Sequence, residues 1–591
     1  MSLSVFPIVA FVLLSAASAS AAPAAFTQVA VESPTFHCIG VRCHVAGDTN
    51  ADAKVALSYR KSGNGAWRRA LDLFRVETAA LHNVDAPPPG EVLFAGSVFF
   101  LEPDTAYELQ LTLRKPGEKD VTRTLKATTW TEPIAPKPRR VLHVVPGKGG
   151  GTGSEADPFK GITLANAVAA PGDLILLHKG VYTGPFVLTK SGTSTAPIVW
   201  RGAPGGEAVL EGPAAGLCVR AQNLRHVFFE RLSFRRCGLA MRMGGSSYVT
   251  VRRCRFTELG WGIIAARRQE RICILDCTFE GIRKWPRNAP DQPKGEHRAV
   301  ELSGIGNVVA YNRIRAFRDA IDTRPQLPIR SCDFHNNDIS ECTDDGIELD
   351  FAETNCRAYL NRITNCYVGI SFQPSRGGPN YAIRNAMYNL QHETYKLHCT
   401  VLSKQEKPIT SGGVILHNTV VRKGSPIHVW AGATPVRHFF MRNNLYVVRD
   451  AERAIDMQCD VQFADWDYNV YAGGPYKIFG KWFRTFYKTY DDFVQGTAQE
   501  AHSRIVKSTR GFFESNVPLP VEIDVKYATT MNDLRPARRS PAVDAGTPLA
   551  NINDGFKGKA PDAGAYELGA PFPHYGPRAE THAGKQPLTL R

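Results

Sequence analysis

Beyond its first 22 residues, the 591-residue chain has no apolar run that approaches the length of about 18 residues of a membrane-spanning helix. None of its 13 cysteines forms a Cys-x-x-Cys zinc pattern. Charged residues make up only 21% of the chain against 43% hydrophobic residues, so the composition gives no case for global disorder. What is abundant is Gly (51) and Pro (39), which favours many short strands joined by turns. A coiled coil, a disordered tail protein and a multi-pass membrane protein are excluded.

The first segment is typical of an export signal. Residues 5–22 are apolar and end in alternating small residues around Ala19 and Ala22, although no Lys or Arg precedes them. We therefore expect residues 1–22 to be a signal peptide and the mature chain to be secreted, either periplasmic or extracellular, without a membrane span. The cysteines are predicted to be structural, as disulfides or stacked buried thiols, and Cys38 and Cys43 are close enough to bridge a hairpin.

A small β domain is predicted at residues 26–131, where apolar and polar residues alternate between Gly, Pro and Asn. The run Leu-Glu-Pro-Asp-Thr-Ala-Tyr-Glu-Leu at 101–109, with Trp67 on an earlier strand, resembles a fibronectin type III sandwich. In that family the tyrosine, here Tyr107, ties a corner between strands. The resemblance implies a spacer or docking module. A Pro-rich basic linker is expected at 132–140.

The rest of the chain repeats with a period near 24. Asn followed two residues later by an apolar residue recurs at intervals of 25, 24, 24, 33, 25 and 26, at Asn312, Asn337, Asn361, Asn385, Asn418, Asn443 and Asn469. Phe234, Phe256 and Phe279 step by 22 and 23. Leucine-rich repeats have a similar period, but their Leu-x-x-Leu-x-Leu unit is missing. Three short strands per coil, stacked as a parallel β-helix over residues 141–569, explain the period, and a tail follows at 570–591.

Both ends of this region resemble one superfamily. Residues 146–153 (Pro-Gly-Lys-Gly-Gly-Gly-Thr-Gly) and 175–183 resemble the first coils of pectate-lyase-like proteins, and 540–546 and 561–567 resemble their closing segment. The resemblance implies an all-β chain with a right-handed, single-stranded parallel β-helix preceded by the small sandwich. It also implies a carbohydrate-active protein, without fixing the reaction.

Strand alternation predicts the candidate site. If Val300, Ile321 and Ile347 point into the core, their successors point outward on adjacent strands about 4.8 Å apart. The outward column is Glu301, Asp322 and Glu348, with Arg324, Asp350 and Gln373 alongside and His428, Trp430 and Asp456 further along. Neighbouring carboxylates raise one another's proton affinity, which favours chemistry. The alternative is a solvated acidic ladder neutralised by Arg298, Arg318 or Arg324.

The first chemistry considered is β-elimination on a uronate polysaccharide. The site is similar to that of chondroitinase B and alginate lyases, in which acidic residues hold calcium. This resemblance implies Glu301, Asp322, Glu348 and Asp350 as Ca²⁺ ligands and Arg376 as the catalytic arginine. The family's catalytic lysine has no match at 351–355, so Lys396, His392 or His297 would have to supply the base.

The second chemistry is hydrolysis by paired carboxyls, either Asp322 with Glu348 or Asp344 and Asp345 with Asp322. Polygalacturonases use three aspartates on this fold, but their His-Gly and Arg-Ile-Lys motifs are missing here. A third possibility is a non-catalytic polysaccharide-binding or adhesin-like protein. Aromatic residues that could stack on sugars are Trp285, Tyr395 and Trp430.

We therefore predict an enzyme that cleaves a polysaccharide, with elimination ranked before hydrolysis. The net charge of +15 favours an anionic polysaccharide as partner, and no nucleic-acid motif is present. We expect a monomer. The predicted catalytic residues are Asp322, Glu348, Asp345, Arg376, Lys396 and His392, and the predicted substrate-binding residues are Arg324, Gln373, Tyr395, His428 and Trp430.

Overall fold

The computed structural model describes residues 22–580 except 64, 82–85, 325–327, 400–407, 431–433, 475 and 532. Residues 1–21 of the predicted signal peptide and residues 581–591 of the predicted tail therefore lie outside the described residues. Across the described part of the chain, none of the helices has the length and apolar character needed to cross a membrane.

Two antiparallel sheets form the N-terminal body. One is ordered β1-β2-β6-β5 and the other β4-β3-β7-β8. The bounds are β1 Ala25–Val31, β2 Ile39–Ala46, β3 Lys54–Lys61, β4 Arg68–Arg69, β5 Phe74–Arg75, β6 Glu91–Val98, β7 Ala106–Arg114 and β8 Val121–Thr128. Their inward residues share one core. The Glu102 backbone N–H donates to the Tyr107 hydroxyl at 3.0 Å, which is the type of corner contact that the sequence predicts.

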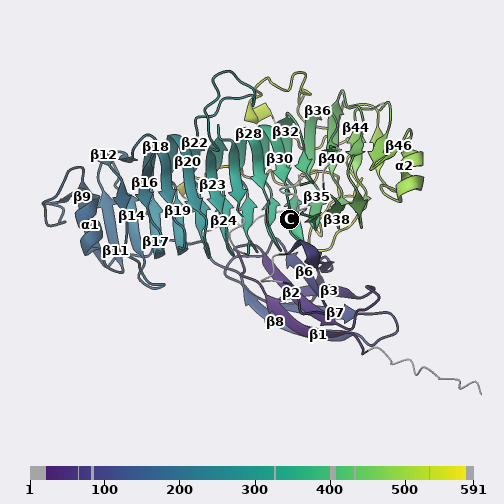
Figure 1. The fold of residues 1–591 in the computed structure, drawn as a ribbon, viewed down its shortest axis with the longest axis horizontal. Helices are drawn as coiled ribbons and strands as arrows, with labels where there is room; N and C mark the ends of the chain where they lie inside the picture. The colour runs from purple at the N-terminus through teal and green to yellow at the C-terminus, as the bar shows by residue number, and fades with distance from the viewer. Residues whose placement is uncertain are drawn as a thin grey trace, which may run out of the picture.

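The second body is a parallel β-helix built on two long sheets of 14 and 18 strands, from β9 (Arg140–Val145) to β47 (Arg504–Val506). Figure 1 shows these strands stacked along one axis, with α1 (Ile162–Val168) at one end and α2 (Tyr490–Thr497) at the other. Solenoids need such caps because a terminal coil has no neighbour to cover its apolar interior. The prediction of an all-β chain with a sandwich followed by a parallel β-helix is confirmed.

Long strands bend round a corner of the coil, so two of the three predicted strands per coil often merge. The strand β28 (Asp338–Glu348) pairs with β25 (Arg313–Arg315) over its first part and with β26 (Asp319–Thr323) near its end. The following strand, β30 (Arg362–Ser371), runs beside the whole of β28, with an irregular register between Cys342 and Asp345. This bend positions the site described below.

Identical residues stack in the interior. The rings of Phe234, Phe256 and Phe279 are parallel, with centroids 4.9 and 4.4 Å apart. An asparagine ladder runs through the turns, each Nδ2 donating to the next Oδ1 at 2.9–3.1 Å from Asn312 to Asn469. One predicted member is wrong, because Asn444 and not Asn443 is in the ladder. Asn443 instead has a φ of 59° at the turn. The cysteines are buried, and Cys38 and Cys43 are separate thiols.

The sandwich is fixed to the β-helix by buried polar contacts. Thr35 donates to Asp333 at 2.6 Å, and Ser331 and Thr354 donate to Glu32 at 2.7 and 2.9 Å. These partners lie on or beside β27 (Asp333–His335) of the 14-stranded sheet. The sandwich therefore lies against the side of the β-helix (Figure 1).

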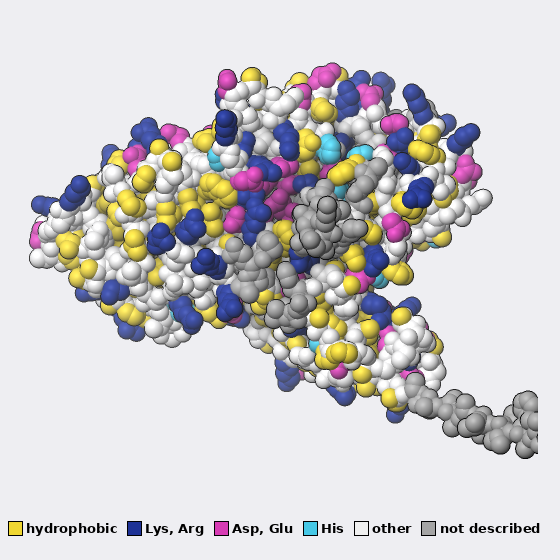
Figure 2. Space-filling view, viewed as in Figure 1, with side chains coloured by type: hydrophobic (Ala, Val, Ile, Leu, Met, Phe, Trp, Pro, Cys, Tyr) yellow, Lys and Arg dark blue, Asp and Glu magenta, His cyan; other side chains and the backbone are white. Residues whose placement is uncertain are grey.

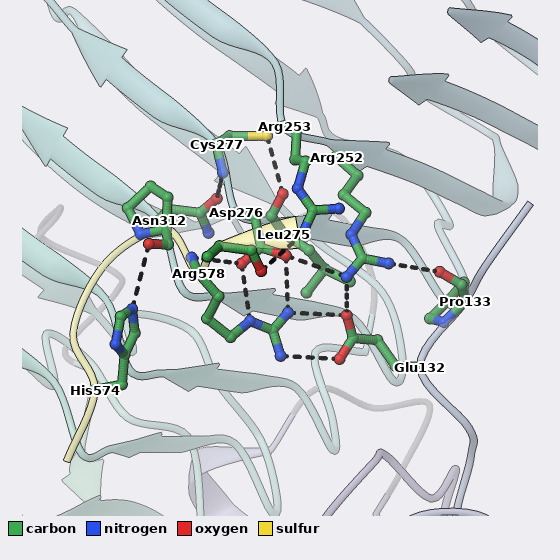
Figure 3. A network of polar contacts seen from close by, with 12 residues as sticks. Glu132, Pro133, Arg252, Arg253, Leu275, Asp276, Cys277, Asn312, His574 and Arg578 are labelled. Atoms are coloured by element: carbon green, nitrogen blue, oxygen red, sulfur yellow. Dashed lines mark hydrogen bonds and ion pairs between the residues drawn. The ribbon is translucent and has the colours of Figure 1, made fainter. Parts of the chain in front are cut away.

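A second junction joins the predicted linker to the C-terminal segment. Arg578 contacts both Glu132 and Asp276 at 2.8 Å, and Arg252 pairs with the same two carboxylates (Figure 3). Each of the two carboxylates therefore has two guanidinium partners, as buried charges require. The network anchors residue 132 directly on the β-helix.

Candidate functional site

An outward column of charged residues crosses adjacent coils, in the register that alternation predicts. The elements are β23 (Arg298–Leu302), β26, β28, β30 and β33 (Tyr395–Lys396). Glu301 pairs with Asp322, Glu348 with Ser371, and Ser371 with Lys396. Ile321 and Ile347 pair on the inward side, which sets Asp322 beside Glu348. The predicted neighbours Glu301, Asp322 and Glu348 are thus brought together.

A second charged column lies at the bend, and strand alternation missed it. Arg298 pairs with Asp319, and Asp345 is the equivalent residue on β28, because it stands two residues before Ile347, which pairs with Ile321. All three side chains are almost fully buried. By alternation from Ile321 and Ile347 they would enter the core. Ala299 and Ala320 lie in the apolar core together with Val300 and Ile321, which follow them. Alternation therefore breaks at this point, and Arg298 and Asp319 join the outer cluster. In the sequence, the signal that could have located these three residues is a charged residue directly before Ala or Gly on the strand.

Guanidinium groups neutralise most of these carboxylates. Arg298 Nε lies 2.5 Å from Asp322 Oδ2 and 3.2 Å from Asp319 Oδ2, while Arg324 Nε lies 2.9 Å from Asp322 Oδ2. Asp344 pairs with Arg287 at 2.7 Å and with Arg318 at 2.9 Å. Lys396 Nζ lies 2.6 Å from Asp345 Oδ2. The three arginines that the acidic-ladder alternative names, Arg298, Arg318 and Arg324, thus do bind these carboxylates.

The pairing is uneven, so the protonation of the carboxyls differs. Burial, and then the nearby Asp322 and Asp319 charges, raise the pKa of Glu348 well above its usual value. Burial and Asp344 raise the pKa of Asp319 in the same way. Burial also acts on Asp344, but Lys396, Arg287 and Arg318 outweigh it and lower the Asp344 pKa. One cleft therefore holds a carboxyl that keeps its proton and another that stays ionised.

The cleft opens over this cluster. Its lining cations are Arg287, Arg298, Arg318, Arg324 and Lys396, and its lining carboxyls are Glu296, Asp344, Asp345, Glu348 and Glu393. Gln373, His392, His398, Tyr367 and Trp430 complete the lining. Figure 2 shows acidic and basic side chains interspersed at the middle of the β-helix body. The cleft is consequently mixed in charge rather than basic.

Several predicted residues line or adjoin this cleft. The His392 ring stacks on Tyr367 at 4.9 Å and lies 6.2 Å from the His428 ring. Trp430 Nε1 donates to His398 Nε2 at 2.6 Å. Asp350 is buried, and it accepts hydrogen bonds from Ser371 Oγ at 2.6 Å and from the Gln373 backbone at 2.7 Å.

Other predicted residues lie elsewhere. Tyr395 is 2% exposed and belongs to the core, because its strand position pairs with inward Ile370; its predicted role in sugar stacking is wrong. Arg376 follows β30, with its guanidinium 5.3 Å from the centre of the Phe351 ring, and it is not among the lining residues. His297 is buried with its pKa lowered to about 4 by burial and Arg283, so it is neutral.

The donor set was tested against the calcium that the resemblance implies. Oxygens of Asp319, Asp322 and Glu348 lie within 4.8 Å of one another, as do those of Asp319, Asp344 and Asp345. Glu301 and Asp350, two of the four predicted ligands, belong to neither group. The Arg298 guanidinium already contacts Asp322 and Asp319 in the first group. Ca²⁺ takes six to eight oxygens, so this arrangement does not fit a resident calcium ion.

The comparisons with known proteins give structural neighbours only. No family model and no curated protein matches the chain. Among solved structures the chain is similar to pectate lyase Pel9A, with 18% identity and a TM-score of 0.40 over 73% of this chain and 97% of that one. It is also similar to an alginate lyase from Paenibacillus sp. str. FPU-7, with 13% identity and a TM-score of 0.30 over 55% of this chain and 95% of that one. A third neighbour is a GH87 α-1,3-glucanase catalytic domain, with 11% identity and a TM-score of 0.29 over 82% of this chain and 96% of that one. At these identities the likeness assigns no residue a role.

Proposed function

We propose that the chain is an exported enzyme that cleaves glycosidic bonds of a polysaccharide by hydrolysis, with Glu348 as the acid and Asp344 as the base. The observation that carries this proposal is the opposite direction of the two pKa shifts within one cleft. A protonated Glu348 can give its proton to the leaving oxygen, and an ionised Asp344 can accept a proton from water.

The spacing of the pair supports a water-mediated route. Asp344 and Glu348 are four residues apart on β28, whereas Asp322 and Glu348 are direct neighbours across one ladder. Asp344 and Glu348 each have an oxygen within 4.8 Å of Asp319 but belong to no common group, and a separation wider than that of direct neighbours is what a water molecule between the base and the sugar requires. Arg287 and Arg318 hold Asp344 in place on one side of the cleft.

Elimination, which the sequence ranks first, loses two of its base candidates. Burial opposes the charge of Lys396, but Asp345 and Asp344 raise its pKa well above the usual value, so it holds its proton. His297 is buried outside the lining. One observation still favours elimination. The third base candidate, His392, lines the cleft, and its ring lies 6.2 Å from that of His428, whose Nδ1 lies 3.2 Å from Asp456 Oδ2.

One assay separates these reactions. Purified protein is incubated with a panel of neutral and acidic polysaccharides, while reducing ends and absorbance near ~235 nm are followed together, because only elimination produces an unsaturated uronate. We expect reducing ends without absorbance. Asp344→Asn and Glu348→Gln should each lower kcat by about 100-fold or more. Glu258→Gln, an exposed change elsewhere on the same sheet, is the matched control.

The outcomes discriminate clearly. Absorbance that rises together with reducing ends, and that is lost in His392→Gln but kept in Asp344→Asn, would replace hydrolysis by elimination. Full activity in both carboxyl variants would overturn the assignment of acid and base. Binding without any cleavage would favour the non-catalytic alternative.

A further inference from the structure

A second groove lies directly beside the cleft, on the coils that precede it. It is lined by Leu217, Arg220, Gln222, Arg242, Trp261 and Arg267, and Glu301 lies at its border with the site. None of the first six was singled out by the sequence. The three arginines are exposed, and Trp261 is half-buried.

The groove continues the outward column of the site. Arg220 on β16 (Leu217–Arg220) pairs with Arg242 on β18 (Leu232–Arg242). Arg242 pairs with Ile264 on β20 (Arg255–Ala265), and Ile264 pairs with Glu301. A linear polymer lying along the β-helix axis over Glu301 and Glu348 would therefore pass over Arg242 and Arg220.

The arginines of the groove differ from those of the cleft in their partners. Within the described part of the chain, no ion pair involves Arg220, Arg242 or Arg267, and Arg220 donates only to the Gln222 amide oxygen, at 2.8 Å. Nearby arginines such as Arg235 and Arg201 do have carboxylate partners, Glu211 and Glu230.

Positive charge on Arg220, Arg242 and Arg267 that no described carboxylate neutralises points to an external anion as the ligand of the groove. Like charges opposite each other on adjacent strands are destabilising. Arg220 and Arg242 are such a pair, and the nearby Arg267 adds a third positive charge. A guanidinium binds carboxylate and sulfate oxygens with two parallel hydrogen bonds, which suits acidic sugar units. Trp261 adds an aromatic surface between the arginines and the cleft, with Arg298 5.1 Å from its ring centre.

We propose that this arginine groove binds acidic units of the polysaccharide that the cleft cleaves, so that the substrate is a linear polysaccharide carrying uronate or sulfate groups. The inference rests on the proposed function for the adjacent cleft. It assigns the acidity of the substrate to subsites outside the reacting residues, because the cleft itself is balanced in charge.

The test measures binding to the full-length chain in the Glu348→Gln background, so that cleavage does not interfere. The probes are an oligogalacturonate, a sulfated oligosaccharide and a neutral oligoglucan, in isothermal titration calorimetry. We expect an acidic probe to bind and the neutral one not to bind. Arg220→Gln with Arg242→Gln should weaken that binding about tenfold. Arg225→Gln, on β17 (Arg225–Glu230) of the other long sheet, is the matched control and should change nothing.

Each outcome bears on the proposal separately from the proposed function. Equal affinity in the double variant and the control, or equally tight binding of single-stranded DNA of the same charge, would overturn the groove. Cleavage of neutral polymers alone would also overturn it while leaving the proposed function intact. Acidic probes that bind through the groove but are not cut would support the groove and reject the enzyme. In the active chain that keeps Glu348, a higher KM at unchanged kcat for Arg220→Gln with Arg242→Gln would support both. If the oligogalacturonate binds more tightly than the sulfated oligosaccharide, the acidic group is uronate; if the sulfated probe binds more tightly, it is sulfate.

Discussion

Lys396 Nζ lies 2.6 Å from Asp345 Oδ2, although the two residues are 51 positions apart and the strand β30 lies between their coils. Lys396 reaches back over Ser371, whose small side chain leaves the space free. A lysine that looks like a base in the sequence is thereby a structural and electrostatic partner of a buried carboxylate.

Removing this lysine should be costly. Lys396→Met leaves Asp345 buried without its cation, and breaking such a pair costs about 3–5 kcal/mol. The double variant Lys396→Met with Asp345→Asn should recover part of the loss, as read from the midpoint of urea unfolding. Lys526→Met breaks the exposed pair with Glu341 and should cost less than about 1 kcal/mol. A double variant no more stable than the single one would show that the pair is not the cause.

The pH dependence follows from the two shifted carboxyls. Activity should fall on the acid side as Asp344 gains a proton, below its usual pKa range, and on the alkaline side as Glu348 loses its proton, above its usual range. Arg318→Gln removes one partner of Asp344, so the acid limb of kcat/KM should move to higher pH by up to about one unit. The alkaline limb should stay in place. Movement of the alkaline limb alone would assign the base to another residue.

Calcium should be dispensable for the unmodified chain. Because Arg298 already contacts Asp319 and Asp322, EDTA should leave activity unchanged and added Ca²⁺ should not raise the melting temperature. Arg298→Ala removes that internal cation, and Ca²⁺ should then stabilise the variant measurably. Arg225→Ala, away from the cluster, should show no response to Ca²⁺. Loss of wild-type activity in EDTA would restore the metal hypothesis.

Alternation and period were enough to predict the fold and the outward column, because each coil repeats the same inward positions. Tyr395 was misassigned although its register with Ile370 was available from the same rule. Asp345 was named as a catalytic candidate, but alternation did not locate it and missed Asp319 altogether, because two consecutive residues, Ala320 and Ile321, enter the core at this point. The contact of the sandwich with Asp333 and the contact of Arg578 with Asp276 each join segments about 300 residues apart in the sequence, and no local pattern encodes them.

The asparagine ladder should carry a measurable share of the stability of the central coils. Asn361 Nδ2 donates to the Phe334 carbonyl at 2.8 Å and to Asn385 Oδ1 at 3.0 Å, and its own Oδ1 accepts from the Asn337 backbone and side chain. Asn361→Ala leaves these buried groups without partners, at about 1–3 kcal/mol for each unsatisfied group. Urea unfolding should therefore show a lower midpoint for Asn361→Ala than for Asn50→Ala, which removes an exposed contact to Asp52. Equal midpoints would mean that water replaces the missing amide and that packing of the apolar interior alone maintains the stack.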